Sequence, residues 1–119
     1  MPQAAILLHK VGGVGWETKK VKSAKGGVIA LDDIKSLMGF GGMAAFVKVG
    51  PDYTLICDET AALKESKPSV GIRMQGKVEV ILGPAVLVRE GPEGFLGLSA
   101  EDEFKLQVGF PWCSPTEAG

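Results

Sequence analysis

Apolar and polar positions alternate along the chain in ways that predict a series of short strands. Residues 4–8 form an uninterrupted apolar run before the Gly12-Gly13 pair, which is typical of a short strand buried on both faces. Residues 16–22 roughly alternate bulky with polar side chains. We therefore expect them to form the hairpin partner of the first strand, with their lysines facing water.

Residues 31–38 instead show the spacing of a helix. Their apolar residues recur at i, i+3, i+6 and i+7, and Asp32 and Asp33 lie where a helix N-terminus favours negative charge. Gly39 follows the last apolar position and is the residue type that most often ends a helix. The pattern predicts a helix capped by Gly39.

A hairpin is expected after this helix. Residues 43–49 and 53–57 have strand-like composition, and a Gly-Pro-Asp turn at residues 50–52 separates them. The acidic pair that follows predicts the start of a short helix over residues 58–64, which Pro68 would end.

The most strand-like stretch, residues 77–89, is interrupted by Gly83-Pro84. Because proline cannot donate to a sheet ladder, this pair predicts a bulge, an edge or a bend between two strands. Placed at a bend, it would let the apolar side chains on both sides share one core. These side chains are Val78, Val80, Leu82, Val86 and Val88.

The C-terminal part predicts a short return strand at residues 96–98 and a last helix over residues 100–108, with Ser99 as its N-cap. Prolines leave residues 111–119 as an irregular tail. We therefore expect one compact α+β domain over residues 1–110. It should hold a mixed or mainly antiparallel sheet of five to seven strands, with two or three short helices on one face.

The composition is that of a globular protein. The chain has 119 residues, of which 45% are hydrophobic and 23% charged, so it can bury a core without metals or disulfides. The formal net charge of −1 creates no basic field. The lysine cluster at residues 19–25 has only Trp16 beside it as a stacking aromatic, so nucleic acid is not an expected partner.

The charges are nevertheless distributed unevenly. Residues 1–50 hold seven lysines against three acids, whereas residues 51–119 hold six basic and eleven acidic side chains. Such a split could draw an anionic ligand to one end or dock one subunit on another. A mixed solvated surface is the simpler explanation.

No catalytic or cofactor motif is recognisable. The Gly12 to Gly15 segment lacks the Lys-Ser/Thr of a phosphate-binding loop, His9 is the only histidine, and no serine lies in a nucleophile elbow. Cys57 and Cys113 have no CxxC spacing, which argues against a disulfide framework and a zinc knuckle. We expect no catalytic residues, no cofactor and no metal.

The cysteine usage fits a reducing compartment. The N-terminal residues lack the features of a signal peptide, and no apolar run approaches the ~20 residues that a membrane-spanning helix needs. These observations predict a cytoplasmic protein with no membrane partner.

A candidate ligand site combines three segments. Asp58 and Glu59 directly follow an apolar strand, Gly41 and Gly42 would let a ligand approach the backbone closely, and Arg73 could hold an anionic group. If these segments converge, they form a concave polar site of the kind that binds small molecules. The alternatives are that the acids begin a helix and that the arginine makes a surface ion pair.

The order of these features resembles a family from phages, plasmids and bacteria that is filed as domain of unknown function 3846. The resemblance covers residues 31–106. It rests on a helix that enters a Gly-Gly turn (34–42), the strand at 43–49, an acidic segment that ends in Leu-Lys (56–64) and a Gly-Pro strand (81–88). It implies a mobile-element setting and no particular activity.

Three functional hypotheses remain open. The first is a non-catalytic binding module of mobile-element type, whose ligand is a host protein or a small anionic metabolite. The second is a small enzyme that uses Asp58 or Glu59 as acid or base and Arg73 as an anion clamp. The third is a structural homo-oligomer.

Overall fold

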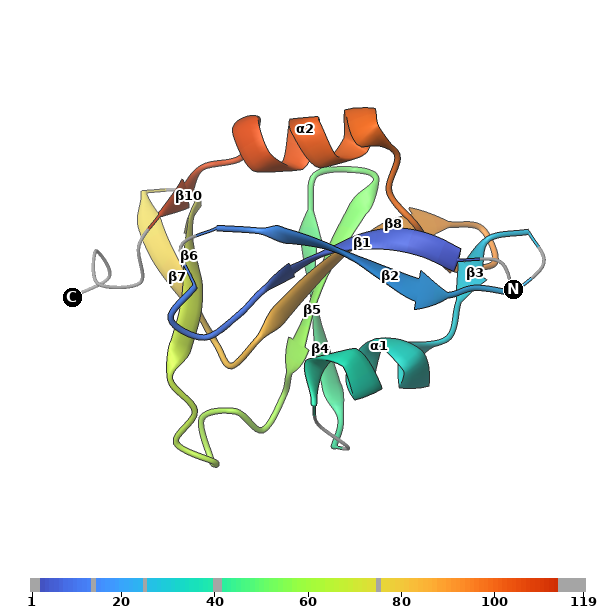
Figure 1. Ribbon diagram of the computed structural model, residues 1–119. Helices are drawn as coiled ribbons and strands as arrows, with labels where there is room; N and C mark the ends of the chain where they lie inside the picture. Colours follow the sequence, from blue (N-terminus) through green and yellow to red (C-terminus); the bar gives the residue numbers. More distant parts are fainter. Residues whose placement is uncertain (1–2, 14, 25, 40–41, 75, 114–119) are drawn as a thin grey trace.

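Ten strands and two short helices make up the part of the chain that the computed structural model describes, residues 3–13, 15–24, 26–39, 42–74 and 76–113 (Figure 1). The strands are β1 (Gln3–His9), β2 (Glu17–Lys22), β3 (Val28–Ile29), β4 (Ala44–Val49), β5 (Tyr53–Asp58), β6 (Pro68–Met74), β7 (Lys77–Leu82), β8 (Ala85–Gly91), β9 (Gly94–Leu96) and β10 (Trp112–Cys113). The helices are α1 (Leu31–Met38) and α2 (Ala100–Val108).

The strands form two sheets. The larger has seven strands in the order β2-β1-β8-β5-β4, with β9 paired to β8 and β3 paired to β9. The smaller has three strands in the order β10-β6-β7. All strand pairs among the described residues are antiparallel. The α+β class is therefore confirmed, but the number of strands is higher than predicted.

The two helices cover opposite faces of the large sheet, above and below it in Figure 1. On one face Leu87 of β8 packs in a cluster with Leu106 of α2, and on the other Val86 and Val88 pack in a cluster with Ile34 of α1. The prediction of helices on one face is thus wrong. A strand that is apolar at successive positions has to be covered on both sides, because its side chains alternate between the faces.

Gly83 turns the chain from the small sheet into the large one. Its φ of 75° lies in the left-handed region that glycine adopts without strain, and its N–H donates to the Lys67 carbonyl. The predicted bend is confirmed. The predicted common core is wrong, because Ile81 is the β7 residue that enters the core and it lies in the α2-side cluster, whereas Val86 lies in the α1-side cluster.

Other local predictions have mixed outcomes. The β1–β2 hairpin, the β4–β5 hairpin and the helix that ends at Gly39 in a left-handed conformation are confirmed. Residues 59–65 form turns instead of a helix. Within the predicted tail, Trp112 and Cys113 pair with β6, and the Trp112 indole N–H donates to the Leu106 carbonyl at 2.6 Å. Residues 114–119 lie outside the described residues. No helix within the described ranges has the length and apolar character needed to cross a membrane.

The two cysteines differ in accessibility, which predicts unequal reactivity. Cys57 lies on β5 with 9% of its surface exposed, and burial raises the pKa of its thiol. Cys113 is only half-buried, on the short strand β10. Because the thiolate is the reactive species, a thiol reagent should modify Cys113 readily and Cys57 only after unfolding. Cys113→Ser should remove the fast phase of the reaction with Ellman's reagent, and two thiols that react at one rate in the native protein would contradict this.

Candidate interaction surface

Two of the predicted ligand-site residues, Gly42 and Asp58, both adjoin Thr60 and Lys64 of the turn that follows β5. A Cβ placed on Gly42 would be 3.8 Å from the Thr60 hydroxyl oxygen and 4.0 Å from Lys64 Nζ. Asp58 ends β5, and its carboxylate accepts hydrogen bonds from the Thr60 N–H, the Thr60 hydroxyl and Lys64 Nζ, each at 2.9 Å. The carboxylate therefore stabilises the turn that follows β5.

The electrostatics of Asp58 agree with this structural role. Burial would raise its pKa, but the hydrogen bonds from Lys64 and Thr60 outweigh burial and hold the pKa below its usual range. An acid–base catalyst at neutral pH needs the opposite shift. The geometry gives no support to Asp58 as an acid or base.

The other predicted residues do not join this pair. Arg73 lies on β6 opposite Val78, and its N–H donates to the Pro111 carbonyl. Arg73 is five residues beyond Pro68, the first residue of β6, which corresponds to about 16 Å along the strand. Because β6 runs from the turn after β5 toward β10, Arg73 lies away from that turn (Figure 1). Glu59 is exposed and pairs through its backbone with Met43. Gly41 lies outside the described residues.

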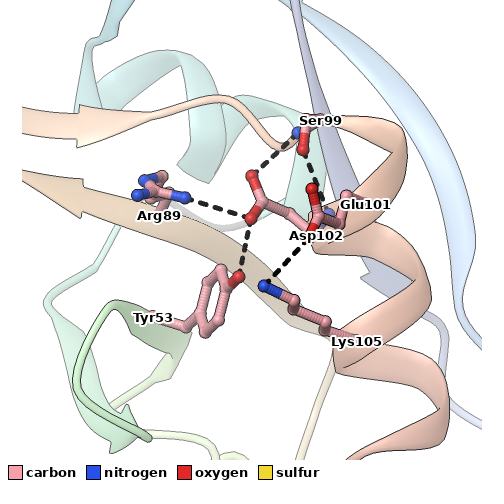
Figure 2. Close-up of polar contacts among 6 residues, drawn as sticks. All are labelled: Tyr53, Arg89, Ser99, Glu101, Asp102 and Lys105. Atoms are coloured by element: carbon pink, nitrogen blue, oxygen red, sulfur yellow. Dashed lines mark hydrogen bonds and ion pairs between the residues drawn. The ribbon is translucent and has the colours of Figure 1, made fainter.

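A buried carboxylate elsewhere attaches α2 to the large sheet. Figure 2 shows Asp102 accepting hydrogen bonds from the Tyr53 hydroxyl at 2.6 Å, Arg89 Nη1 at 3.0 Å and the Ser99 N–H at 3.0 Å. The Ser99 hydroxyl accepts from the Asp102 N–H in return, which completes a capping box. The predicted N-cap is confirmed.

The charge of Asp102 is stabilised inside this network. Burial would raise its pKa, but the hydrogen bonds from Ser99 and Tyr53 and the Arg89 charge lower it overall. The same hydrogen bond to Asp102, together with burial, raises the pKa of Tyr53 to about 12. Both groups are held in the protonation states that keep α2 attached at neutral pH.

A small hollow lies at the turn between β1 and β2. Its volume is about 180 Å³, and it is lined by Lys10, Gly13, Gly15, Trp16 and Glu17. Pockets that enclose small molecules usually measure about 300–1,000 Å³. Within the described residues, no group of three or more histidine, cysteine, aspartate or glutamate side chains is placed to hold a metal ion.

The β4 edge offers backbone groups for an added strand. The Glu59 N–H donates to the carbonyl of Met43, which lies directly opposite it, so Met43 and Glu59 form a hydrogen-bonded pair. Hydrogen-bonded and non-hydrogen-bonded pairs alternate along an antiparallel ladder. Residues 45, 47 and 49 therefore bond to β5, and the backbone groups of Ala44, Phe46 and Lys48 point outward. Among the described residues β4 pairs with β5 alone.

An aromatic side chain accompanies this unpaired backbone. Phe46 is 50% exposed, and its ring stacks on Phe95 with the centroids 5.6 Å apart and the planes 21° from parallel. Lys48, the charged residue of the strand, forms an ion pair with Glu90, which also accepts a hydrogen bond from Thr54. We call the outward backbone of Ala44, Phe46 and Lys48, with the Phe46–Phe95 rings, the β4 edge.

The opposite edge of the sheet is chemically different. β2 has the sequence Glu-Thr-Lys-Lys-Val-Lys, so three of its six residues are lysines. Lysines on an edge strand hinder pairing with another strand. Of these two edge strands, β2 is protected by its charges and β4 is largely apolar.

No family model, curated protein or solved structure matches this chain. The resemblance to domain of unknown function 3846 stays a prediction.

Sequence reasoning found the β4 hairpin but missed the β4 edge. The signal was present, since residues 44–49 contain a single charge and no proline. Which strand lies at an edge depends on the order of strands in the sheet, which alternation of side chains does not reveal.

Proposed function

We propose that this protein is a non-catalytic protein-binding module that adds an extended segment of its partner to the β4 edge. The observation that carries the proposal is the outward backbone of Ala44, Phe46 and Lys48 beside a half-exposed phenylalanine. Strand addition gains affinity from main-chain hydrogen bonds and specificity from alternate side chains. Here Phe46 and Phe95 would contact an apolar residue of the added strand.

The other functions receive less support from the geometry. A site for a small anionic metabolite needs Arg73 near the Gly42–Asp58 turn, and Arg73 lies at the far end of β6. The enzyme hypothesis needs a carboxylate open to substrate, but both oxygens of Asp58 already accept hydrogen bonds. A host protein as partner, a cytoplasmic location and a mobile-element setting remain predictions from the sequence.

Adjacent alanines in β4 provide a matched test. Ala44→Pro removes an outward N–H, whereas Ala45→Pro removes an N–H that bonds to β5. We expect Ala44→Pro to keep the thermal stability of the wild type, and Ala45→Pro to lose about 2 kcal/mol of unfolding free energy. The two melting curves would establish which residues face outward.

Binding is then measured by fluorescence anisotropy at low-micromolar protein. The probe is a labelled short peptide of alternating valine and threonine with a central phenylalanine, N-methylated at every second residue so that only one of its edges can pair. We expect the wild type to bind it and Ala44→Pro to bind it at least about tenfold more weakly. Equal affinities, or no binding to the wild type at a dilution at which it is monomeric, would overturn the proposal.

A further inference from the structure

We infer that the segment added to the β4 edge is β4 of a second copy of this chain, paired antiparallel about a two-fold axis that passes beside Phe46. The inference rests on the proposed function, because it names the partner of the same surface. It makes the two large sheets one continuous sheet. Three observations carry it: the register of the outward groups, the placement of side chains and the contrast between the two sheet edges.

The outward-facing residues of β4 are spaced symmetrically about Phe46. Ala44 lies two positions before Phe46, and Lys48 lies two positions after it. An antiparallel partner centred on the same residue places Phe46 opposite Phe46, and each Ala44 opposite Lys48 of the other copy. In all three pairs the outward groups of both strands face each other, so each pair exchanges two N–H···O bonds. No outward group of residues 44–48 would remain unpaired.

The side chains also fit a second copy. Directly opposite residues lie on the same face of a sheet, so the two Phe46 rings become neighbours. Because each Phe46 already stacks on Phe95, pairing would create a continuous row of four aromatic rings on the α1 side. Each Lys48 faces an alanine, and its charge is balanced by Glu90 of its own chain. No like charges are placed opposite each other.

The β2 edge lacks this self-complementarity. An antiparallel pairing of β2 with itself centred on Lys19 or Lys20 would place two lysines directly opposite each other. Of these two edges, β4 therefore suits a second copy better, and closed two-fold pairing there leaves no free β4 edge for further growth.

Sedimentation equilibrium over a dilution series tests the inference. We expect the wild type to reach twice the mass of one chain, and both Phe46→Lys and Phe46→Glu to associate at least about tenfold more weakly, because like charges would then lie directly opposite. An equimolar mixture of the two variants should recover a dimer, because opposite charges would then face each other. Phe104→Lys, at an exposed phenylalanine on α2 (67% exposed), is the matched control and should dimerise like the wild type.

The outcomes separate this inference from the proposed function. A wild type that stays monomeric, or a dimer that Phe46→Lys leaves intact, overturns pairing through β4. Failure of the mixed charge variants to associate overturns the two-fold register. If the wild type is monomeric but the N-methylated peptide still binds and Ala44→Pro abolishes that binding, the strand-adding function stands and only the second copy as partner fails.

Discussion

Val86→Asp should remove a large part of the folding stability of the protein. Val86 is completely buried in the middle of the large sheet, with Leu8 of β1 on one side and Ile56 of β5 on the other. The substitution would bury a carboxylate among apolar side chains with no cation to pair it, at a cost of about 4 kcal/mol or more. Because small domains are stable by only about 5–15 kcal/mol, this loss should move the midpoint of urea unfolding to a much lower urea concentration.

Val80→Asp is the matched control for this experiment. Val80 lies on β7 in the small sheet and is only half-buried, so an introduced carboxylate can stay hydrated. We expect it to lower the midpoint of urea unfolding far less than Val86→Asp does. Similar losses in the two variants would mean that β7 and β8 contribute to the core equally, as the sequence alone suggested, and would contradict the division into two sheets.

Both helices and the β1–β2 and β4–β5 hairpins of this fold were predictable because each is specified locally. Apolar spacing and first-turn acids specify α1, Gly39 ends it, and Ser99 begins α2 through its hydroxyl. Hairpin partners follow each other in the chain with short turns between them. Interactions within a few residues decide such features, so the sequence carries them directly.

The arrangement of the elements was not predictable in the same way. β8 lies between β1 and β5, which are far from it in sequence, and this position buries Val86 and Leu87 on opposite faces. A continuous apolar run indicates burial on both faces but does not say which elements provide the cover. The prediction of helices on one face is therefore wrong, since the central strands require cover on both faces.

The candidate site illustrates the same limit. The positions of strand ends and glycines predict that Asp58, Gly42 and Arg73 converge. Gly42 and Asp58, which adjoin the β4–β5 hairpin, do lie near each other. Arg73 lies on β6, which belongs to the small sheet. The chain passes from the small sheet to the large sheet at the Gly83 turn. The β4 edge depends on strand order alone, so a surface of this kind becomes visible only when the whole sheet is assembled.

Asp102→Asn should lower the unfolding free energy by about 2–3 kcal/mol at pH 7, because it removes a buried charge that accepts hydrogen bonds from Tyr53, Arg89 and Ser99. Tyr53→Phe, which removes only one of these bonds, should cost about 1 kcal/mol. Urea unfolding measures both losses. A loss no larger in Asp102→Asn than in Tyr53→Phe would show that the carboxylate charge does not hold α2 to the sheet.

The dependence of this loss on pH tests the role of the charge itself. The pKa of Asp102 is lowered in the native protein, so its contribution to stability is complete above the unfolded-state pKa near 4 and is lost as the pH falls through the native pKa. Asp58, whose pKa is also lowered, titrates in the wild type and the variant alike and cancels from their difference. The difference in unfolding free energy between wild type and Asp102→Asn should therefore stay constant from pH 7 to about 5 and decrease steadily below about 4. If this difference in unfolding free energy instead keeps its neutral-pH value down to about pH 2, the variant loses packing or hydrogen-bond geometry and the negative charge contributes nothing.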